Sequence, residues 1–212
     1  MLKIVFLSEV PAQKGPAIFI DRDGVINCRR PDDYVLSFSQ FVFMPGIRTV
    51  LKQLAGLGLP MIVISNQAAV GKGLLDAAGL QEITARMEQT LREDGTLLTA
   101  AYYCVHRSDA DCACRKPKPE LLYRAANDFN IDLSRSVFIG DSETDVRAAR
   151  GAGCGPVLFG PGLTNHSDSE EWMTDLPVAL VAEGLFEVVA KSLQGRGMVS
   201  HDHVGRYSDP GA

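Results

Sequence analysis

The 212-residue sequence has no long hydrophobic run, since glycine, proline or charged residues interrupt its apolar stretches. A transmembrane helix, which needs about 20 mostly apolar residues, is therefore not expected. Positive charge is not in excess either, because 21 lysines and arginines face 26 aspartates and glutamates. With a net charge of −5, nucleic acid is not an expected partner. The first ten residues lack a small-residue cleavage site and match a signal peptide poorly.

An even set of cysteines is also missing. The five cysteines argue against a disulfide framework in a chain of this size. Three of them lie within eleven residues together with His106, which favours a metal site in a reducing compartment. We therefore expect a cytoplasmic protein. Hydrophobic residues make up 46% and charged residues 22% of the sequence, which excludes disordered, collagenous and coiled-coil chains.

Short apolar runs alternate with amphipathic segments along the chain. The expected strands are 17–20, 61–64, 97–103, 136–139 and 156–159, and the expected helices are 47–57, 76–93, 119–130, 143–151 and 182–193. This alternation predicts an α/β fold with three α/β/α layers around a parallel sheet. We expect one domain over residues 1–194 with its core at 17–160, followed by a flexible tail at 195–212.

Two carboxylates follow the first expected strand. Alternate residues that leave a strand point to the same side, so Asp21 and Asp23 can converge on one small volume. Such a pair needs a cation or a shared proton, and Mg²⁺ is the cation that prefers oxygen ligands. A nucleophile beside a general acid is the matching chemistry. Taken alone, the Asp-x-Asp pattern at a strand end is a weak signal and more often marks a side-chain-capped turn.

The ends of the other strands carry complementary groups. Ser65, Asn66 and Gln67 follow the second strand and offer a hydroxyl and backbone N–H donors. Lys116 precedes a helix, whose N-terminus favours anions. Asp141 follows the fourth strand and adds a carboxylate. Because ligands bind at the carboxyl ends of parallel strands, these groups together describe a phosphoryl-transfer site.

At this point the chain resembles the haloacid dehalogenase (HAD) superfamily of phosphohydrolases. The motifs that carry the resemblance are Asp21-x-Asp23, Ser65, Lys116 and Gly140-Asp141-x-x-x-Asp145, in the order in which the superfamily has them. The resemblance covers about residues 17–160 and implies a Rossmann-like, HAD-type fold.

The resemblance also implies a role for each motif residue. Asp21 would be the nucleophile that forms an aspartyl-phosphate, and Asp23 the general acid and then the base. Ser65 and Lys116 would hold the phosphoryl group. The expected ligands of a catalytic Mg²⁺ are Asp21, Asp141 and the Asp23 carbonyl, with Asp145 in the outer shell.

A second constellation lies in the loop 104–114. Cys104, His106, Cys112 and Cys114 supply three thiolates and one imidazole, which complete a tetrahedral structural zinc site. Its expected role is to fold the loop that delivers Arg115 and the neighbouring lysine. The alternative is a loop that carries free thiols.

The spacing of the motifs leaves no room for a separate cap domain, since 43 residues separate Asp21 from Ser65 and 50 separate Ser65 from Lys116. A capless core with this Cys/His loop resembles the heptose bisphosphate phosphatases and the histidinol-phosphate phosphatases. The loop Asn66–Gly73 is more similar to the former. The expected substrate-binding residues are Arg29, Arg30, Asn66, Gln67, Arg115 and Ser142.

We therefore expect a Mg²⁺-dependent phosphatase, monomeric, that acts on a small phosphorylated sugar, with histidinol phosphate as the alternative substrate. A polynucleotide 3′-phosphatase is disfavoured by the acidic composition. A non-catalytic, zinc-stabilised interaction module has no need for the acid at Asp23.

Overall fold

The computed structural model describes residues 1–7, 10–30, 34–160, 178–179 and 182–196. Its seven strands form one sheet in the order β1-β4-β3-β2-β5-β6-β7. The strands are β1 (Leu2–Val5), β2 (Ile18–Ile20), β3 (Met61–Asn66), β4 (Ala100–Cys104), β5 (Val137–Gly140), β6 (Gly155–Phe159) and β7 (Val178–Ala179). Every pair is parallel except β1 with β4. The predicted α/β class with a mostly parallel sheet is therefore confirmed.

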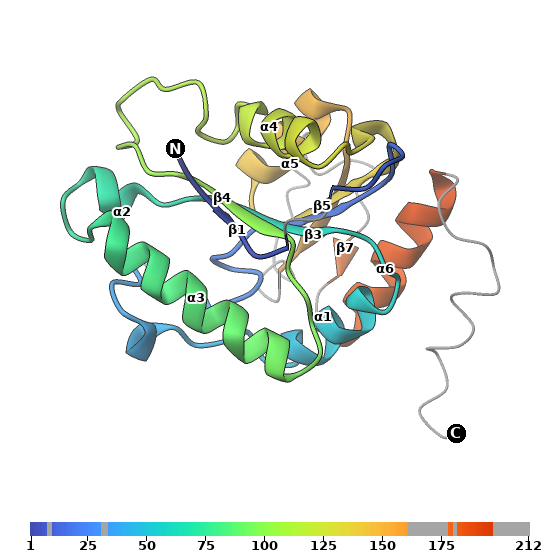
Figure 1. Cartoon of the computed structure of the whole chain (residues 1–212), viewed down its shortest axis with the longest axis horizontal. Helices are drawn as coiled ribbons and strands as arrows, with labels where there is room; N and C mark the ends of the chain where they lie inside the picture. The colour runs from blue at the N-terminus through green and yellow to red at the C-terminus, as the bar shows by residue number, and fades with distance from the viewer. Residues whose placement is uncertain (8–9, 31–33, 161–177, 180–181, 197–212) are drawn as a thin grey trace, which may run out of the picture.

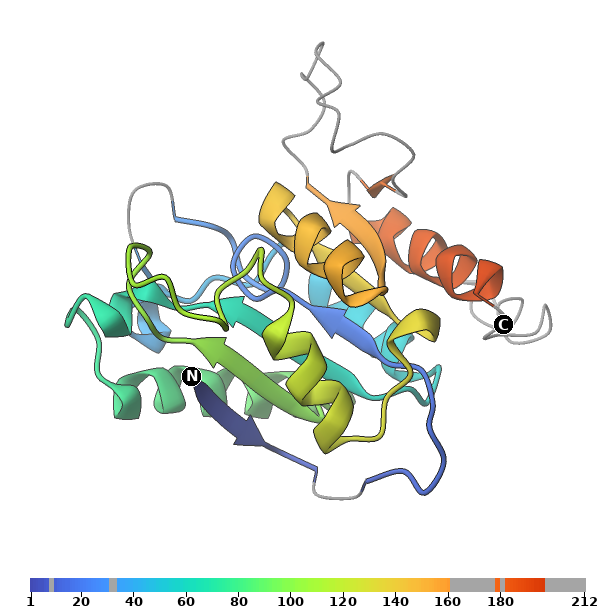
Figure 2. The ribbon, with the colours of Figure 1, turned by 90° about the horizontal axis from the view of Figure 1, so that it is seen from above.

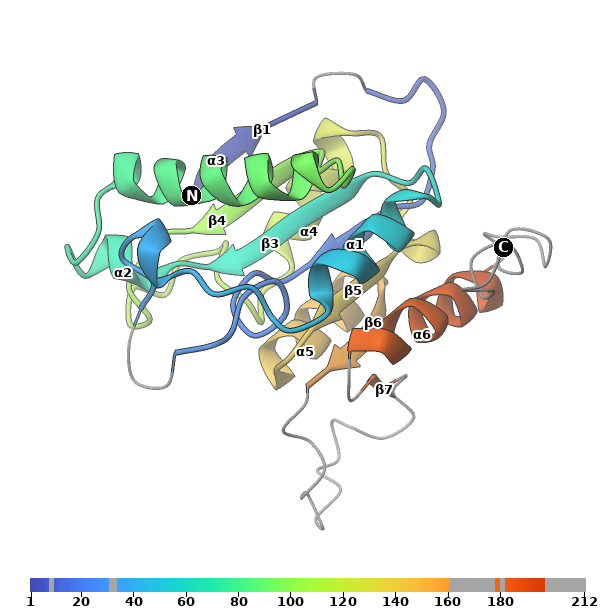
Figure 3. The same ribbon diagram turned by 90° about the horizontal axis from the view of Figure 1, so that it is seen from below.

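The helices cover both faces of the sheet. They are α1 (Ile47–Ala55), α2 (Ala68–Gly71), α3 (Ala77–Glu93), α4 (Glu120–Asp128), α5 (Glu143–Ala152) and α6 (Ala182–Gly195), with 3-10 turns η1 (Phe38–Gln40) and η2 (Leu133–Arg135). Helices α4 and α5 lie on one face, and α1, α3 and α6 on the other (Figures 1, 2 and 3). Within the described part of the chain, no helix has the length and apolar character to cross a membrane.

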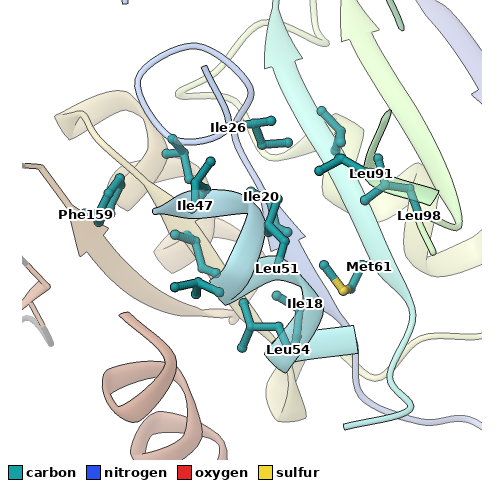
Figure 4. Close-up of a cluster of buried hydrophobic side chains, with 14 of the residues drawn as sticks. Ile18, Ile20, Ile26, Ile47, Leu51, Leu54, Met61, Leu91, Leu98 and Phe159 are labelled. Carbon is teal, nitrogen blue, oxygen red and sulfur yellow. The ribbon is translucent and has the colours of Figure 1, made fainter. Parts of the chain in front are cut away.

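Successive side chains of each strand point to opposite faces of the sheet, so the core has two parts. Ile18 and Ile20 of β2 pack toward α1, where Leu51 and Leu54 are fully buried (Figure 4). Phe19, which lies between them, packs in the other core under α4 and α5. Each fully buried side chain of this size contributes about 1.5–3 kcal/mol relative to its exposed state. The central strands are thus packed on both faces.

The sequence analysis did not identify β1, and the sheet is not wholly parallel as expected. Leu2 and Ile4 are half-buried and alternate with exposed Lys3 and Val5. The strand pairs antiparallel with β4 at the sheet edge. Four residues are too few for their alternation to be recognised without the neighbouring strand. The Lys3 ammonium also lies 2.7 Å from a carboxylate oxygen of Asp128 in α4.

The last helix runs two residues beyond its expected end at Leu193. Arg196 then donates a hydrogen bond of 2.7 Å from Nη1 to the Ser134 carbonyl. The first two residues of the expected tail therefore belong to the folded domain. The rest of that segment, 197–212, lies outside the described residues.

Candidate active site

The carboxyl ends of β2, β3 and β5 border a cavity of about 700 Å³. The predicted site residues among its lining are Asp21, Asp23, Arg29, Arg30, Ser65, Asn66, Arg115, Lys116 and Ser142. Four separate stretches of the chain supply them, because the parallel register aligns these strand ends. Between β2 and β4 the described residues form η1, α1, β3, α2 and α3, and most of the described segment between β2 and α1 is loop.

Three carboxylates gather beside β2. Asp21, Asp141 and Asp145 each offer an oxygen, and these atoms all lie within 4.8 Å of one another. Burial and the repulsion of the neighbouring carboxylates raise the pKa of Asp21 to about 6. Burial and the charge of Asp21 raise the pKa of Asp141 to about 7. The cluster therefore carries more negative charge than its surroundings balance, which is the condition for binding a hard divalent cation.

Two glycines allow the carboxylates to approach the backbone this closely. Gly24 has a φ of +94°, and a Cβ added there would lie 1.8 Å from Oδ2 of Asp141. A Cβ on Gly140 would lie 2.2 Å from the Cβ of Asp145. A larger residue at either position would displace a carboxylate of the cluster.

Lys116 balances part of this charge from inside the protein. Its side chain is 3% exposed, and Nζ lies 2.9 Å from Asp21 Oδ1 and 2.6 Å from Asp145 Oδ1. Burial opposes the ammonium charge, but the two carboxylates outweigh burial and raise the pKa of Lys116. Asn66 braces the lysine, because its side-chain amide bonds both the N–H and the carbonyl of Lys116. The lysine therefore stays charged and fixed at the cavity floor.

Asp23 is held apart from the carboxylate cluster. Its oxygens accept hydrogen bonds from the Arg22 guanidinium, from Asn27 and from Gln67. Burial opposes ionisation of Asp23, yet the charge of Arg22 and these bonds outweigh burial and lower its pKa. Gln67 also donates to Ser65 Oγ at 3.1 Å. Asp23 is thus an oriented carboxylate in the chain without ligand.

The N-terminus of α5 fixes Asp145. Its Oδ2 accepts from the backbone N–H groups of Asp141 and Ser142, each at 3.2 Å, and from the Ser142 hydroxyl at 2.6 Å. A carboxylate is favoured there by the partial positive charge of the helix end. Ser142 therefore serves as a helix cap at the cavity wall.

Basic side chains line the remaining wall of the cavity. Arg29 contacts Asp141 Oδ1 at 2.7 Å, and Lys118 contacts Asp111 Oδ1 at 2.7 Å. Arg115 is half-buried, and its buried Nη1 has no hydrogen-bond partner among the described residues. A buried donor without a partner costs about 1–3 kcal/mol, so this N–H group is suited to donate a hydrogen bond to an anionic group of a ligand.

The Cys/His loop brings its four predicted ligands together. Cys104 Sγ lies 3.5 Å from Cys112 Sγ, and Cys112 Sγ lies 3.8 Å from Cys114 Sγ. His106 Nδ1 lies 3.6 Å and 3.3 Å from the sulfurs of Cys104 and Cys114. Zinc bonds of about 2.3 Å to sulfur and 2.0 Å to nitrogen give tetrahedral edges of roughly 3.5–3.8 Å. The observed spacing fits a tetrahedral zinc ion.

Helix α2 packs against this loop rather than against the cavity. A Cβ on Gly71 would lie 2.5 Å from the Arg107 backbone nitrogen and 2.7 Å from the Val105 carbonyl oxygen. Residues 68–74 are absent from the lining of the cavity. The helix instead supports the loop that precedes Arg115.

Two amides that we expect to contact substrate also form hydrogen bonds within the protein. Asn66 lines the cavity but its amide is bonded to Lys116, and Gln67 is buried with its amide bonded to Asp23. The sequence analysis also missed Arg22, which is 1% exposed and pairs with Asp23. An arginine between two aspartates after a buried strand is the signal that could have identified it, since a buried guanidinium requires a carboxylate partner.

The chain is similar in sequence to known phosphatases. Residues 113–188 match the HAD-hydrolase-like family. The chain is 36% identical over 145 residues to the D-glycero-β-D-manno-heptose-1,7-bisphosphate 7-phosphatase of Pseudomonas aeruginosa, covering 68% of this chain and 81% of that protein. It is 32% identical over 185 residues to the enzyme of the same name from Yersinia pestis, covering 80% and 97%.

A solved structure shows the same similarity. The D,D-heptose 1,7-bisphosphate phosphatase of B. bronchiseptica, complexed with magnesium and phosphate, superposes with a TM-score of 0.74 at 29% identity. The match covers 83% of this chain and 98% of that one.

Proposed function

The chain belongs to the HAD-like hydrolases as a homologue of the D-glycero-D-manno-heptose-1,7-bisphosphate 7-phosphatases, and on that premise we propose that it removes the 7-phosphate of this bisphosphate. One observation carries the proposal. A single cavity joins Asp21 of the carboxylate cluster and buried Lys116 to Arg115, whose buried Nη1 has no hydrogen-bond partner among the described residues. The first group suits a phosphate under attack, and the second suits a phosphate that stays on the sugar.

We assign the chemistry to the two aspartates after β2. Asp21 attacks phosphorus, and the bond from phosphorus to the sugar oxygen breaks as Asp23 gives that oxygen a proton. Water then attacks the aspartyl-phosphate while Asp23 takes one of its protons. Phosphate leaves, and the Asp21 carboxylate is restored.

The protonation of Asp23 follows from its surroundings. In the chain without ligand the lowered pKa of Asp23 keeps it ionised, which is the form needed by the base of the second step. The first step requires the acid form. The negative charge of an arriving phosphate opposes ionisation of a nearby carboxyl, and so favours uptake of the proton.

The remaining groups hold the phosphoryl oxygens. Lys116 supplies a fixed positive charge, and the buried Ser65 hydroxyl lines the cavity. Magnesium, when bound, would neutralise phosphoryl oxygens as a Lewis acid. We propose Asp21, Asp141 and the Asp23 carbonyl as its ligands, with Asp145 in the outer shell, and the crowded carboxylates fit that role. The magnesium in the B. bronchiseptica relative supports it.

We propose zinc at the Cys/His loop as a structural ion. Four protein ligands close a tetrahedral site and leave no position for substrate. Cys114 directly precedes Arg115 and Lys116 in the sequence, so an ordered loop fixes the start of both side chains. We also propose that Arg115 takes the sugar's other phosphate, with Arg29 and Arg30 at the same wall.

A substrate panel tests the proposed function. Phosphate release is measured with both anomers of the heptose bisphosphate, with histidinol phosphate and with a 3′-phosphorylated oligonucleotide, in the presence and absence of Mg²⁺. We expect the highest kcat/KM with a heptose bisphosphate, and only with Mg²⁺. Asp21→Asn should lose more than about a hundredfold in rate. A higher kcat/KM for histidinol phosphate would overturn the assignment. We further propose that the active species is a monomer.

A further inference from the structure

We infer that Arg22 is a positioning residue, which aims the Asp23 carboxyl at the leaving-group oxygen. The inference rests on the proposed function and adds a residue to it. Arg22 follows the nucleophile directly, yet its side chain is almost wholly buried. Arg22 borders the cavity but exposes almost no surface, so its role is to hold neighbouring groups in place.

The guanidinium forms hydrogen bonds to Asp23 through two of its nitrogens. Nη2 donates to both Oδ1 and Oδ2 at 2.9 Å, and Nε donates to Oδ1 at 3.2 Å. This fork fixes the plane of the carboxylate, which a single hydrogen bond does not. Asn27 and Gln67 bond the same two oxygens from other directions. The rotamer of Asp23 is thus set by three side chains, of which only Arg22 is charged.

The backbone of Arg22 links these hydrogen bonds to the nucleophile Asp21. Its N–H donates to Asp21 Oδ1 at 2.7 Å. One residue therefore contacts the carboxylates of both Asp21 and Asp23. A shift of Arg22 would change the distance between the attacking and the proton-donating groups, and general acid catalysis is sensitive to that distance.

Burial explains why this side chain is an arginine. A buried charge is retained only with a well-matched partner, and Nη1 is buried without a hydrogen-bond partner among the described residues. A buried guanidinium that is incompletely paired costs free energy that an apolar side chain at this position would not. We therefore attribute the arginine to the orientation of Asp23 and not to stability.

Substrates with different leaving groups distinguish a positioning role of Arg22 from a purely structural one. A nitrophenolate leaves without a proton, whereas a sugar alkoxide needs one, so only the second depends on a well-aimed acid. The ratio kcat/KM reports the steps up to departure of the leaving group, and the later hydrolysis of the aspartyl-phosphate does not enter it.

We therefore compare Arg22→Lys with the wild type on 4-nitrophenyl phosphate and on the heptose bisphosphate. General acids contribute 10²–10⁴ in rate, so misaiming one should lower kcat/KM for the alkyl phosphate about ten- to a hundredfold. The loss for the aryl phosphate should stay below about threefold. Equal losses for both substrates would overturn the inference.

Thr84→Val is the matched control for buried polar packing. Thr84 donates to the buried Tyr103 hydroxyl at 3.0 Å, and neither residue lines the cavity. This variant should lower the Tm and leave the ratio of the two kcat/KM values unchanged. A changed ratio in Thr84→Val would show that general destabilisation produces the effect, and would overturn the inference.

A double variant keeps the test decisive if Arg22→Lys does not fold. Arg22→Met with Asp23→Asn removes both charges and leaves no buried charge unpaired. If Arg22 acts only through Asp23, the double variant should be no more than about threefold slower on the alkyl phosphate than Asp23→Asn alone. A further tenfold loss would overturn the inference. Absence of activity toward any phosphate ester in the wild type would instead remove the proposed function, and the inference with it.

Discussion

The charges of Asp21, Asp141, Asp145 and Lys116 explain why the site recruits both cations and phosphate. Three carboxylates and one ammonium leave two negative charges, and Arg29 at Asp141 balances one of them. A divalent cation that replaced Arg29 at the carboxylate would bring the net charge of these groups to zero. The basic side chains of the cavity wall would then attract an anionic substrate. The same arginine, once displaced, would be available to the substrate.

At the residue scale we predict that Arg115→Ala discriminates between substrates. Loss of a hydrogen bond to a charged group costs about 1.5–3 kcal/mol, or about ten- to a hundredfold in kcat/KM, for the bisphosphate. A small monophosphate should be affected little, because it lacks the second phosphate. The measurement is kcat/KM for both substrates.

Lys118→Ala is the control for that prediction. Lys118 also lines the cavity, but it is half exposed and paired with the exposed Asp111. Exposed pairs contribute about 0–1 kcal/mol, so this variant should change neither kcat/KM by more than about fivefold. Equal losses for the two substrates in Arg115→Ala would place the arginine at the reacting phosphate or in the fold.

Residue types and spacing were enough to predict most of the candidate site. The positions of Asp21 and the cysteine ligands follow from local spacing after strand ends. The settings of Asn66 and Gln67 do not, because their amides bond Lys116 and Asp23, which lie 50 and 44 residues away in the sequence. Side-chain amides both donate and accept, so their partners depend on the assembled fold.

At the scale of elements, periodicity predicted the buried helices and strands but not their ends. The helix expected over 119–130 stops at Asp128, and Asn130 has a φ of +52°. The strand expected from Leu97 starts at Ala100, where pairing with β3 sets its beginning. These boundaries depend on neighbouring elements. Apolar spacing in a single segment does not contain that information.

For the Cys/His loop we predict about one zinc per chain in the purified protein. Cys112→Ser should lower the zinc content and reduce activity, because the loop that precedes Arg115 and Lys116 loses a ligand. Metal analysis and kcat/KM measure the two effects. Cys28→Ser is the control. Cys28 lies outside the cluster, so this variant should keep its zinc. Full zinc loading in Cys112→Ser would contradict the proposed ligand set.

At the scale of the whole molecule, the raised pKa values of Asp21 and Asp141 make stability depend on pH. Between about pH 4 and 7 the folded chain holds more protons on these groups than the unfolded chain, whose carboxyls have ordinary pKa values. The free energy of unfolding therefore falls as pH rises through this window. The lowered pKa of Asp23 acts in the opposite sense but below this window.

We predict that the magnesium-free protein becomes less stable from pH 5 to pH 7, and that saturating Mg²⁺ offsets this loss. Urea unfolding at fixed pH, in buffer without chelator so that zinc is retained, measures the effect. Asp141→Asn should flatten the dependence of stability on pH, because it removes one of the two carboxyls whose pKa is raised. A free energy of unfolding that rises toward pH 7 without Mg²⁺ would contradict the charge analysis.

The central place of β2 has a kinetic consequence. Asp21 leaves a strand that pairs with β3 on one side and β5 on the other, and its partners Lys116 and Asp145 follow about 95 and 124 residues later in the chain. Closing such long loops is slow, because the entropy is lost before the contacts form. During refolding from urea, far-ultraviolet circular dichroism should therefore recover before phosphatase activity does. Simultaneous recovery of the two signals would show that these distant segments meet as early as the local helices form.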